Sequence, residues 1–461
     1  MAERLANLGY LGLVKETTPG TPLTPTDFIP LYDETVSTSM NFVDQQPIYG
    51  NKFATYATLQ GLRSHKGDVT VMAEPNTTAK LFDSLLTKVS SVQTYTFTVT
   101  SANATAGATY TNNSVTFTVS TTITAQTTLV MTGSGAPTTS GTLTKVSGTG
   151  DATITFSAFT AGTTTTHTFG LISDSNSYTW DISTGNVVAR YFGVKASKIT
   201  PTWNKTEMQW KVSISALGSF QGRALSATPI GSGPYTVALD TTYDPNPTTG
   251  LVVGDLIRFY HAPSTTIDAT VASIVDGQHI TTSTNVTSMV QGDFVYLRPA
   301  TVAFTVQPTF IWPKTQFQFG TTAAIALTNS QLRVEQGSIF EVMHSFESDD
   351  GAARSGAFDP ASLVRTTGDA TLTIKKFFDT PDDVATMNAL SKTAVVVRHF
   401  SGTTNQYECR VTFNHLSTDG TVVPDIKSMD IAYSEIDYHV DYDQTDAQAY
   451  LVQVTNALST I

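Results

Sequence analysis

Apolar and polar residues alternate along much of this chain, which is the pattern of β-strands with one buried face. In GATYTNNSVTFTVSTTI, Gly107–Ile123, the apolar residues Val115, Phe117 and Val119 alternate with threonine and serine. Just before them, Asn112-Asn113 can adopt the positive φ angles of a tight hairpin turn. The pattern predicts a hairpin here and a mainly β fold for the chain.

Two segments have the apolar spacing of helices. The first, PNTTAKLFDSLLTK, follows the strand that ends before Pro75, and Asn76 or Thr77 can act as its N-cap. Its apolar face is predicted to consist of Leu81, Phe82, Leu85 and Leu86. The second, DTPDDVATMNALSK, has Thr380 as N-cap and Pro381 at the first helical position.

The same order of elements occurs twice. A Gly-Asp turn and an alternating strand precede each helix, in GDVTVMAE (Gly67–Glu74) and GDATLTIKKFF (Gly368–Phe378). A pair of predicted strands follows each helix further along, within Tyr191–Gly218 and Tyr407–Ile436. This order predicts an internal duplication.

Two segments interrupt the repeat. Ser101–Thr165 belongs to a charge-poor run, Val89–Gly170, whose only charged residues are Lys145 and Asp151. Gly233–Val302 contains two further Gly-Asp turns that each open a strand, and it is predicted as a small barrel or sandwich. We therefore expect a first β-sandwich or split-barrel domain (1–232) interrupted by a Thr/Gly-rich β module (101–165), an inserted β module (233–302), and a second such domain (303–461), with one flanking helix per domain.

Composition narrows the class of protein. Charged residues make up 14% of the 461 residues, against roughly 25% in ordinary globular proteins. The net charge is −12 and there is no cluster of Lys and Arg, so tight binding to nucleic acid phosphates is not expected. The single cysteine, Cys409, excludes an internal disulfide, and neither a signal peptide nor a membrane span is expected.

No arrangement of residues predicts catalysis or a cofactor. There is no Ser-His-Asp order and no glycine-rich phosphate loop, and the adjacent acids Asp349 and Asp350 lie in a predicted turn, where they lack the fixed geometry of an acid–base pair. In EIDYHVDYD, Glu435–Asp443, side chains of metal-ligand type share one strand face, but neighbours on one face point in parallel and rarely converge on an ion. We expect neither an enzyme nor a metal site.

Several segments resemble the major tail tube protein of long, flexible-tailed bacteriophages. The stretch Gly9–Glu34 resembles the extended arm that opens many such proteins. HTFGLISDSNSYTWDIS (His167–Ser183), followed by YFGVKASKITPTW (Tyr191–Trp203), resembles the strand pairs that close the tube domain. The 101–165 module resembles a Thr/Gly-rich segment found in several phage structural proteins.

The resemblance implies a virion structural protein whose rings stack into a hollow tube for DNA ejection. Six tube domains normally form a ring, so a chain with two domains implies a trimer with pseudo-sixfold symmetry. The implied partners are the tape-measure protein, the tail terminator and the distal tail or baseplate proteins, with DNA passing through without specific binding. Assembly would take place in the host bacterial cytoplasm, and the inserted 101–165 module would lie on the outside of the tube.

Two sets of residues follow from this interpretation. Acidic residues on one strand are predicted to face the bore and repel DNA phosphates; they are Asp437, Asp441 and Asp443, on the face that also carries His439. Two loops are predicted to pack on neighbouring subunits; their residues are Asn41, Gln45, Tyr49, Phe53, Asp349, Asp350, Arg354 and Phe358. The alternative is a phage or bacterial surface protein whose β modules bind glycans. A polysaccharide hydrolase lacks a credible carboxylate pair.

Overall fold

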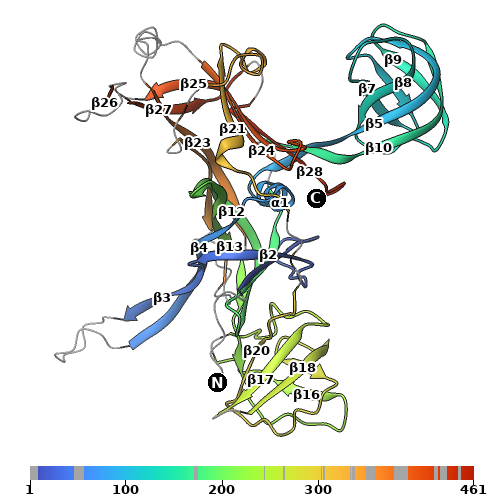
Figure 1. Cartoon of the computed structure of the whole chain (residues 1–461). Helices are drawn as coiled ribbons and strands as arrows, with labels where there is room; N and C mark the ends of the chain where they lie inside the picture. Colours follow the sequence, from blue (N-terminus) through green and yellow to red (C-terminus); the bar gives the residue numbers. More distant parts are fainter. Residues whose placement is uncertain are drawn as a thin grey trace.

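The computed structural model describes residues 9–45, 57–170, 175–242, 244–262, 265–302, 304, 307–332, 334, 338–348, 359–360, 362–377, 393–419, 424–425, 433–444 and 448–461. Strands account for 62% and helices for 5% of the structure, so the predicted mainly β class is confirmed. Figure 1 shows three parts: a central body of long strands, a barrel on a two-stranded stalk, and a second small module at the opposite end.

The N-terminal part of the central body has six principal strands, which pair in the order β1–β11–β12–β13–β4–β3. Their bounds are β1 (Tyr10–Lys15), β3 (Ser37–Gln45), β4 (Ala57–Met72), β11 (Tyr178–Ser183), β12 (Val188–Asn204) and β13 (Glu207–Ala216). A further strand, β2 (Asp27–Glu34), pairs with β1 and then with β4. The N-terminal stretch compared above with an extended arm is thus built into the sheets.

The C-terminal part of the central body repeats this topology. Six strands pair in the order β21–β24–β25–β27–β23–β22. Their bounds are β21 (Thr315–Gly320), β22 (Ile339–Ser348), β23 (Leu363–Phe377), β24 (Thr393–Ser401), β25 (Tyr407–Asp419) and β27 (Tyr433–Asp441). Both the order along the chain and the order of pairing match those of the N-terminal six.

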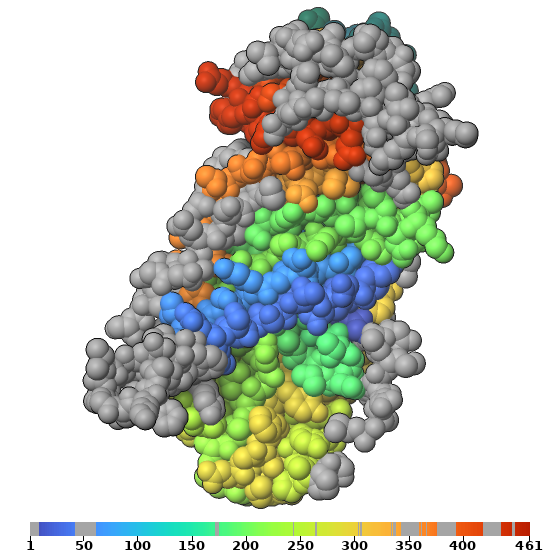
Figure 2. Space-filling view, turned by 90° about the vertical axis from the view of Figure 1, so that its left-hand side faces the viewer, coloured from blue at the N-terminus to red at the C-terminus, as the bar shows by residue number. Residues whose placement is uncertain are grey.

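One pairing joins the two parts edge to edge. Strands β12 and β22 are antiparallel neighbours, with Ile199 opposite Val342. The result is a continuous sheet in the order β3–β4–β13–β12–β22–β23–β27–β25. Figure 2 shows this sheet as successive bands of blue, green, orange and red across one face of the molecule.

The other face of the sheet is covered by a single hydrophobic core. Alternate residues of the strands point into it, including Val71 of β4, Trp210 of β13, Phe340 of β22 and Leu372 of β23, all at most 1% exposed. The short elements η2 (Trp312–Lys314) and α2 (Ala323–Ala326) border this region. Because the core includes residues from both parts of the central body, the two are packed as one unit.

Helix α1 (Pro75–Leu85) covers the N-terminal part of the core. Leu81, Phe82, Leu85 and Leu86 are buried, as the apolar spacing predicted. The cap prediction was wrong: Glu74 is the N-cap and Pro75 takes the first helical turn, where its missing N–H costs nothing. The second predicted helix, DTPDDVATMNALSK, lies outside the described residues.

The charge-poor run forms a closed six-stranded barrel. The strands pair in the ring β5–β10–β9–β6–β7–β8 and back to β5. Their bounds are β5 (Thr87–Ala104), β6 (Thr109–Asn112), β7 (Val115–Val119), β8 (Ile123–Gly133), β9 (Gly141–Ser147) and β10 (Thr153–Gly170). The hairpin turn lies one residue later than predicted, since Asn113 and Ser114 have the positive φ angles.

The barrel has its own aromatic core, separate from that of the central body. The ring of Phe97 lies edge-on to Phe117 at 5.5 Å and to Phe156 at 5.0 Å between centroids. Phe117 also covers Gly133 on the adjacent strand, where a Cβ atom would lie 2.5 Å from the ring. The sequence needs a glycine there because a side chain would displace the aromatic core.

A stalk connects the barrel to the central body. Its two strands are the outer ends of β5 and β10, which pair from Thr87 with Gly170 to Gln93 with Thr165. The β10 end also pairs with β28 (Tyr450–Asn456), which in turn pairs with β25. Barrel pairing with β8 begins at Gln93 and pairing with β10 resumes at Tyr95, earlier than the Ser101 boundary expected from composition.

Deleting the barrel should leave the central body folded. Replacing residues 94–164 by Asn-Gly joins Gln93 to Thr165, two residues already paired across the stalk, through the turn that closes two-residue hairpins. We expect a cooperative thermal transition within a few degrees of that of the full chain, measured by circular dichroism. Loss of cooperative unfolding in the shortened chain would contradict the independence of the two cores.

The second module, Arg223–Leu297, is built on a further core, to which Tyr10, Val188 and Phe220 of the adjoining strands also contribute. Its strands pair in the order β15–β20–β17–β18–β19–β16, and a bridge from Leu225 to Leu239 brings the two ends of this path together. Their bounds are β15 (Arg223–Ala224), β16 (Tyr235–Ala238), β17 (Leu256–His261), β18 (Thr265–Ile274), β19 (His279–Thr282) and β20 (Phe294–Leu297). The preceding strand β14 (Gly218–Phe220) pairs with β12.

A buried charge cluster holds the second module against the central body. Arg190 of β12, 1% exposed, donates two hydrogen bonds to Asp181 of β11, at 2.7 and 2.8 Å. It also donates to Asp255 of the second module at 2.5 Å and to the carbonyl of Gly250 at 3.2 Å. One guanidinium therefore connects two carboxylates from different parts of the fold.

Candidate functional site

The side of the continuous sheet opposite the hydrophobic core carries polar side chains almost throughout. We call this side the polar sheet face. It includes four lysines and six carboxylates, which are Lys66, Lys198, Lys211, Lys375, Asp68, Glu341, Asp369, Glu435, Asp437 and Asp441. Threonine and serine fill many of the remaining positions.

Two lysines of the polar sheet face are neutralised by carboxylates on the neighbouring strand. Lys211 Nζ lies 2.9 Å from Asp68, and Lys198 Nζ lies 2.7 Å from Glu341 across the junction between the two halves of the sheet. Burial raises the pKa of Asp68, but hydrogen bonds from Ser213 and Lys211 outweigh it, and the pKa lies below its ordinary value. These two lysines are therefore not available as free positive charge for binding phosphates.

The acidic strand predicted from EIDYHVDYD is β27. Asp437 and His439 are exposed and Asp441 is half-buried, on the polar sheet face as expected from their spacing. Asp443 lies beyond the end of the strand at Asp441 and is buried, with its carboxylate 3.3 Å from Nε2 of His415, the residue paired with Asp441. Among the described residues no group of three potential metal ligands converges.

A row of eight residues crosses the polar sheet face from one edge to the other. Paired positions on successive strands give Asp33, Thr70, Lys211, Thr200, Glu341, Thr371, His439 and Ser417. At the middle of the row, the hydroxyl of Thr200 donates to Glu341 at 3.3 Å. The second four residues repeat the first four in chemical type: an acid, a threonine, a base and a hydroxyl.

Both ends of this row lie at open sheet edges. Asp33, at the end of β2, pairs with Thr70 of β4 on one side, and no described strand pairs with it on the other. Ser417 pairs with His439 of β27, whereas pairing of β25 with β24 ends at Leu416. Among the described residues, each end thus exposes a short length of unpaired strand backbone, which can add another strand.

The predicted contact loops are only partly described. Asn41 and Gln45 lie in β3, where Asn41 is exposed and sits at a register shift. The others, Tyr49, Phe53, Asp349, Asp350, Arg354 and Phe358, lie outside the described residues. The strands that lead into these loops, β3 with β4 and β22 with β23, are hairpins at equivalent places in the repeat.

In the described part of the chain, no helix is long and apolar enough to cross a membrane. A scan of the chain against models of known protein families found no match, and a search of curated proteins found no similar sequence.

Proposed function

We propose that this chain is the major tail tube subunit of a bacteriophage, in which three copies close into a ring and the rings stack into a hollow conduit for DNA. In this proposal the two halves of the central body are two copies of one tube domain. The observation that supports it best is the row of eight residues, because its first and second halves are equivalent in both pairing and chemistry.

The junction inside the chain then serves as a template for the junction between chains. Within the chain, Thr200 ends the first half of the row and meets Glu341. Ser417 is equivalent to Thr200 in the repeat. Asp33 of β2 takes the place of Glu341, because Asp33 pairs with Thr70 as Glu341 pairs with the corresponding Thr371. If the next chain joins with the same strand pairing as at the β12–β22 junction, Ser417 of one chain lies beside Asp33 of the next.

The resulting dimensions suit duplex DNA. Three copies of an eight-stranded sheet give a closed wall of about 24 strands, and with a spacing of about 4.8 Å and moderate tilt its backbone diameter is roughly 37–48 Å. Side chains narrow the bore, but a wall of this diameter still leaves room for a DNA duplex to pass.

The placement of charge and of the inserted barrel favours the polar sheet face as the bore wall. Two of its four lysines are paired with acids and its carboxylates outnumber its lysines, so sliding DNA would meet weak repulsion instead of adhesion. The barrel lies on the side of the molecule away from the face seen in Figure 2 and would project outward from the tube.

Engineered cysteines test the proposed junction directly. The double variant Asp33→Cys, Ser417→Cys should form disulfides between chains, because directly paired strand residues bring their Cβ atoms within bonding range. On a non-reducing gel we expect covalent dimers and a closed trimer as the largest species. The native Cys409 is fully buried and should not react.

Two variants control this experiment. Thr200→Cys with Glu341→Cys should form a disulfide within one chain, because these residues meet at the internal junction. Asp33→Cys with Thr373→Cys should form none, because β23 is an interior strand of the sheet. Ladders that extend to six chains, or particles without a central hole in electron micrographs, would rule out the trimeric ring.

A further inference from the structure

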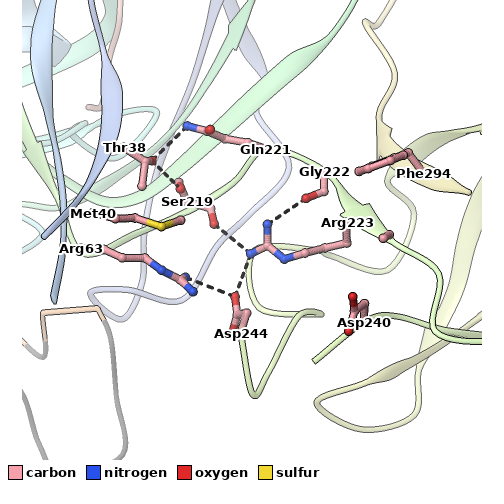
Figure 3. A pocket seen from close by; sticks show the side chains of 11 residues that line it. Thr38, Met40, Arg63, Ser219, Gln221, Gly222, Arg223, Asp240, Asp244 and Phe294 are labelled. Atoms are coloured by element: carbon pink, nitrogen blue, oxygen red, sulfur yellow. Dashed lines mark hydrogen bonds and ion pairs between the residues drawn. The ribbon is translucent and has the colours of Figure 1, made fainter. Parts of the chain in front are cut away.

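A pocket of about 290 Å³ lies where the β3–β4 hairpin meets the second module. Figure 3 shows Thr38 and Met40 on one side and Phe294 of β20 on the other, with Arg223 between them. Ser37 and Ser39 are on the polar sheet face, so Thr38 between them points to the opposite side. The pocket therefore opens away from the proposed bore.

The charges of the pocket are already balanced. Arg223 donates to Asp244 at 2.8 Å, and Arg63 lies 3.5 Å from the same carboxylate oxygen. Arg63 is also 3.5 Å from Asp359, and Asp240 adds a further carboxylate to the wall. Because two arginines face three carboxylates, the pocket has no surplus positive charge to attract a phosphate or an acid.

Acceptor atoms of Asp240 and Gln221 remain for a ligand, whereas Arg223 Nε, which has no hydrogen-bond partner among the described residues, is buried out of a ligand's reach. Asp240 uses Oδ1 to accept from the hydroxyl and the N–H of Thr242, which lowers the pKa of this carboxyl, and Oδ2 has no partner in the described part of the chain. Gln221 donates through Nε2 to Thr38 and Tyr191 and leaves its carbonyl oxygen as an acceptor.

An aromatic surface continues from the rim of the pocket. Phe294 is 55% exposed, and its neighbour across the strand pair is Tyr260 of β17. Tyr296, two residues further along β20, points to the same side of the module and is half-buried. Exposed rings beside a polar pocket suit a ligand that presents C–H groups on one face and hydroxyls around its edge.

We propose that this pocket binds one neutral sugar residue of a glycan, whose neighbouring residues lie over Tyr260 and Tyr296. Sugar hydroxyl groups can donate to the free acceptors of Asp240 and Gln221. The volume is at the lower end for small-molecule sites and fits a single ring, not a drug-sized ligand.

Saturation-transfer NMR on the full chain tests this with three neutral probes: glucose, galactose and N-acetylglucosamine. We expect transfer from the protein to at least one of them. Phe294→Ala and Asp240→Asn should each weaken that binding by about tenfold, the effect of losing one contact worth about 1.4 kcal/mol. Ile230→Ala removes an exposed apolar side chain of the same module that does not line the pocket, and it should leave binding unchanged.

The other outcomes are decisive against the proposal. Absence of transfer to all three sugars would overturn it, as would binding that survives Phe294→Ala. Binding of glucosamine without N-acetylglucosamine would show that the ligand is a cation. If the unmodified chain binds no sugar and Phe294→Ala prevents ring formation, the aromatic surface around Phe294 is a contact between subunits and not a sugar site. The cysteine experiment above is independent, so either proposal can fail alone.

Discussion

Replacing Arg190 by alanine should destabilise the protein by about 3–5 kcal/mol, because the change leaves buried carboxylates without their cation. Asp181 is 7% and Asp255 2% exposed, and both depend on this guanidinium for charge compensation. Burial raises the pKa of Asp181 even with Arg190 present, although hydrogen bonding to Arg190 opposes the shift. The measurement is the free energy of unfolding by urea at neutral pH.

The matched control is Arg258→Ala in the second module. Arg258 forms a similar two-bond pair with Asp268, at 2.5 and 2.8 Å, but this pair is at the surface. Such pairs contribute no more than about 1 kcal/mol. We also expect Arg190→Ala to recover part of its lost stability on acidification, because protonation removes the uncompensated charge. A loss of about 1 kcal/mol or less in Arg190→Ala would refute the account of the buried cluster.

The second large effect is a loss of stability in mild acid caused by His399. This ring is 1% exposed and lies about 6 Å from the rings of Trp203, Phe310 and Phe340, and burial lowers its pKa to about 3 from the ordinary 6.5. The unfolded chain binds a proton below pH 6.5, whereas the folded chain does so only near pH 3. Folding stability therefore falls with falling pH in this window, by up to about 1.4 kcal/mol per pH unit.

The variant His399→Phe isolates this contribution. It removes the titrating group, and the Thr315 hydroxyl keeps its bond to the carbonyl of Ile311. Between pH 6.5 and 4.5 the wild-type protein should lose about 2 kcal/mol more than the variant. His167 is also buried with a lowered pKa and remains in both proteins, so its effect cancels. Equal acid sensitivity of the two proteins would show that His399 is not the cause.

The sequence predicts the local elements well where periodicity and turn residues act over short range. Helix α1 and strand β7 lie where the apolar spacing places them. Their ends were less predictable: Pro75 shifts the N-cap to Glu74, and the positive φ angles fall on Asn113 and Ser114. The exact ends of a helix or turn depend on contacts with neighbouring side chains, and the pattern of residue types along the chain does not specify those contacts.

Long-range pairing was harder to foresee. The barrel closes because β5 pairs with both β8 and β10, and these contacts are far apart in sequence. The burial of Asp443 depends in the same way on His415 of another strand. The eight-residue row follows from strand register, which no local pattern specifies. The two Gly-Asp turns are 301 residues apart in the sequence. A search at that offset would have matched one pair of equivalent residues in the row, Thr70 and Thr371, and missed the other pairs.

The internal β12–β22 pairing has a kinetic consequence for assembly. Since half of the domain junctions of the proposed ring already exist within folded monomers, closure needs three junctions between separate chains instead of six. Covalent linkage replaces the other three with intramolecular docking at high effective concentration. The sequences of the two linked halves can also change independently of each other. Only every second domain of the proposed ring then carries an outward barrel, so the exterior has threefold symmetry around a nearly sixfold channel.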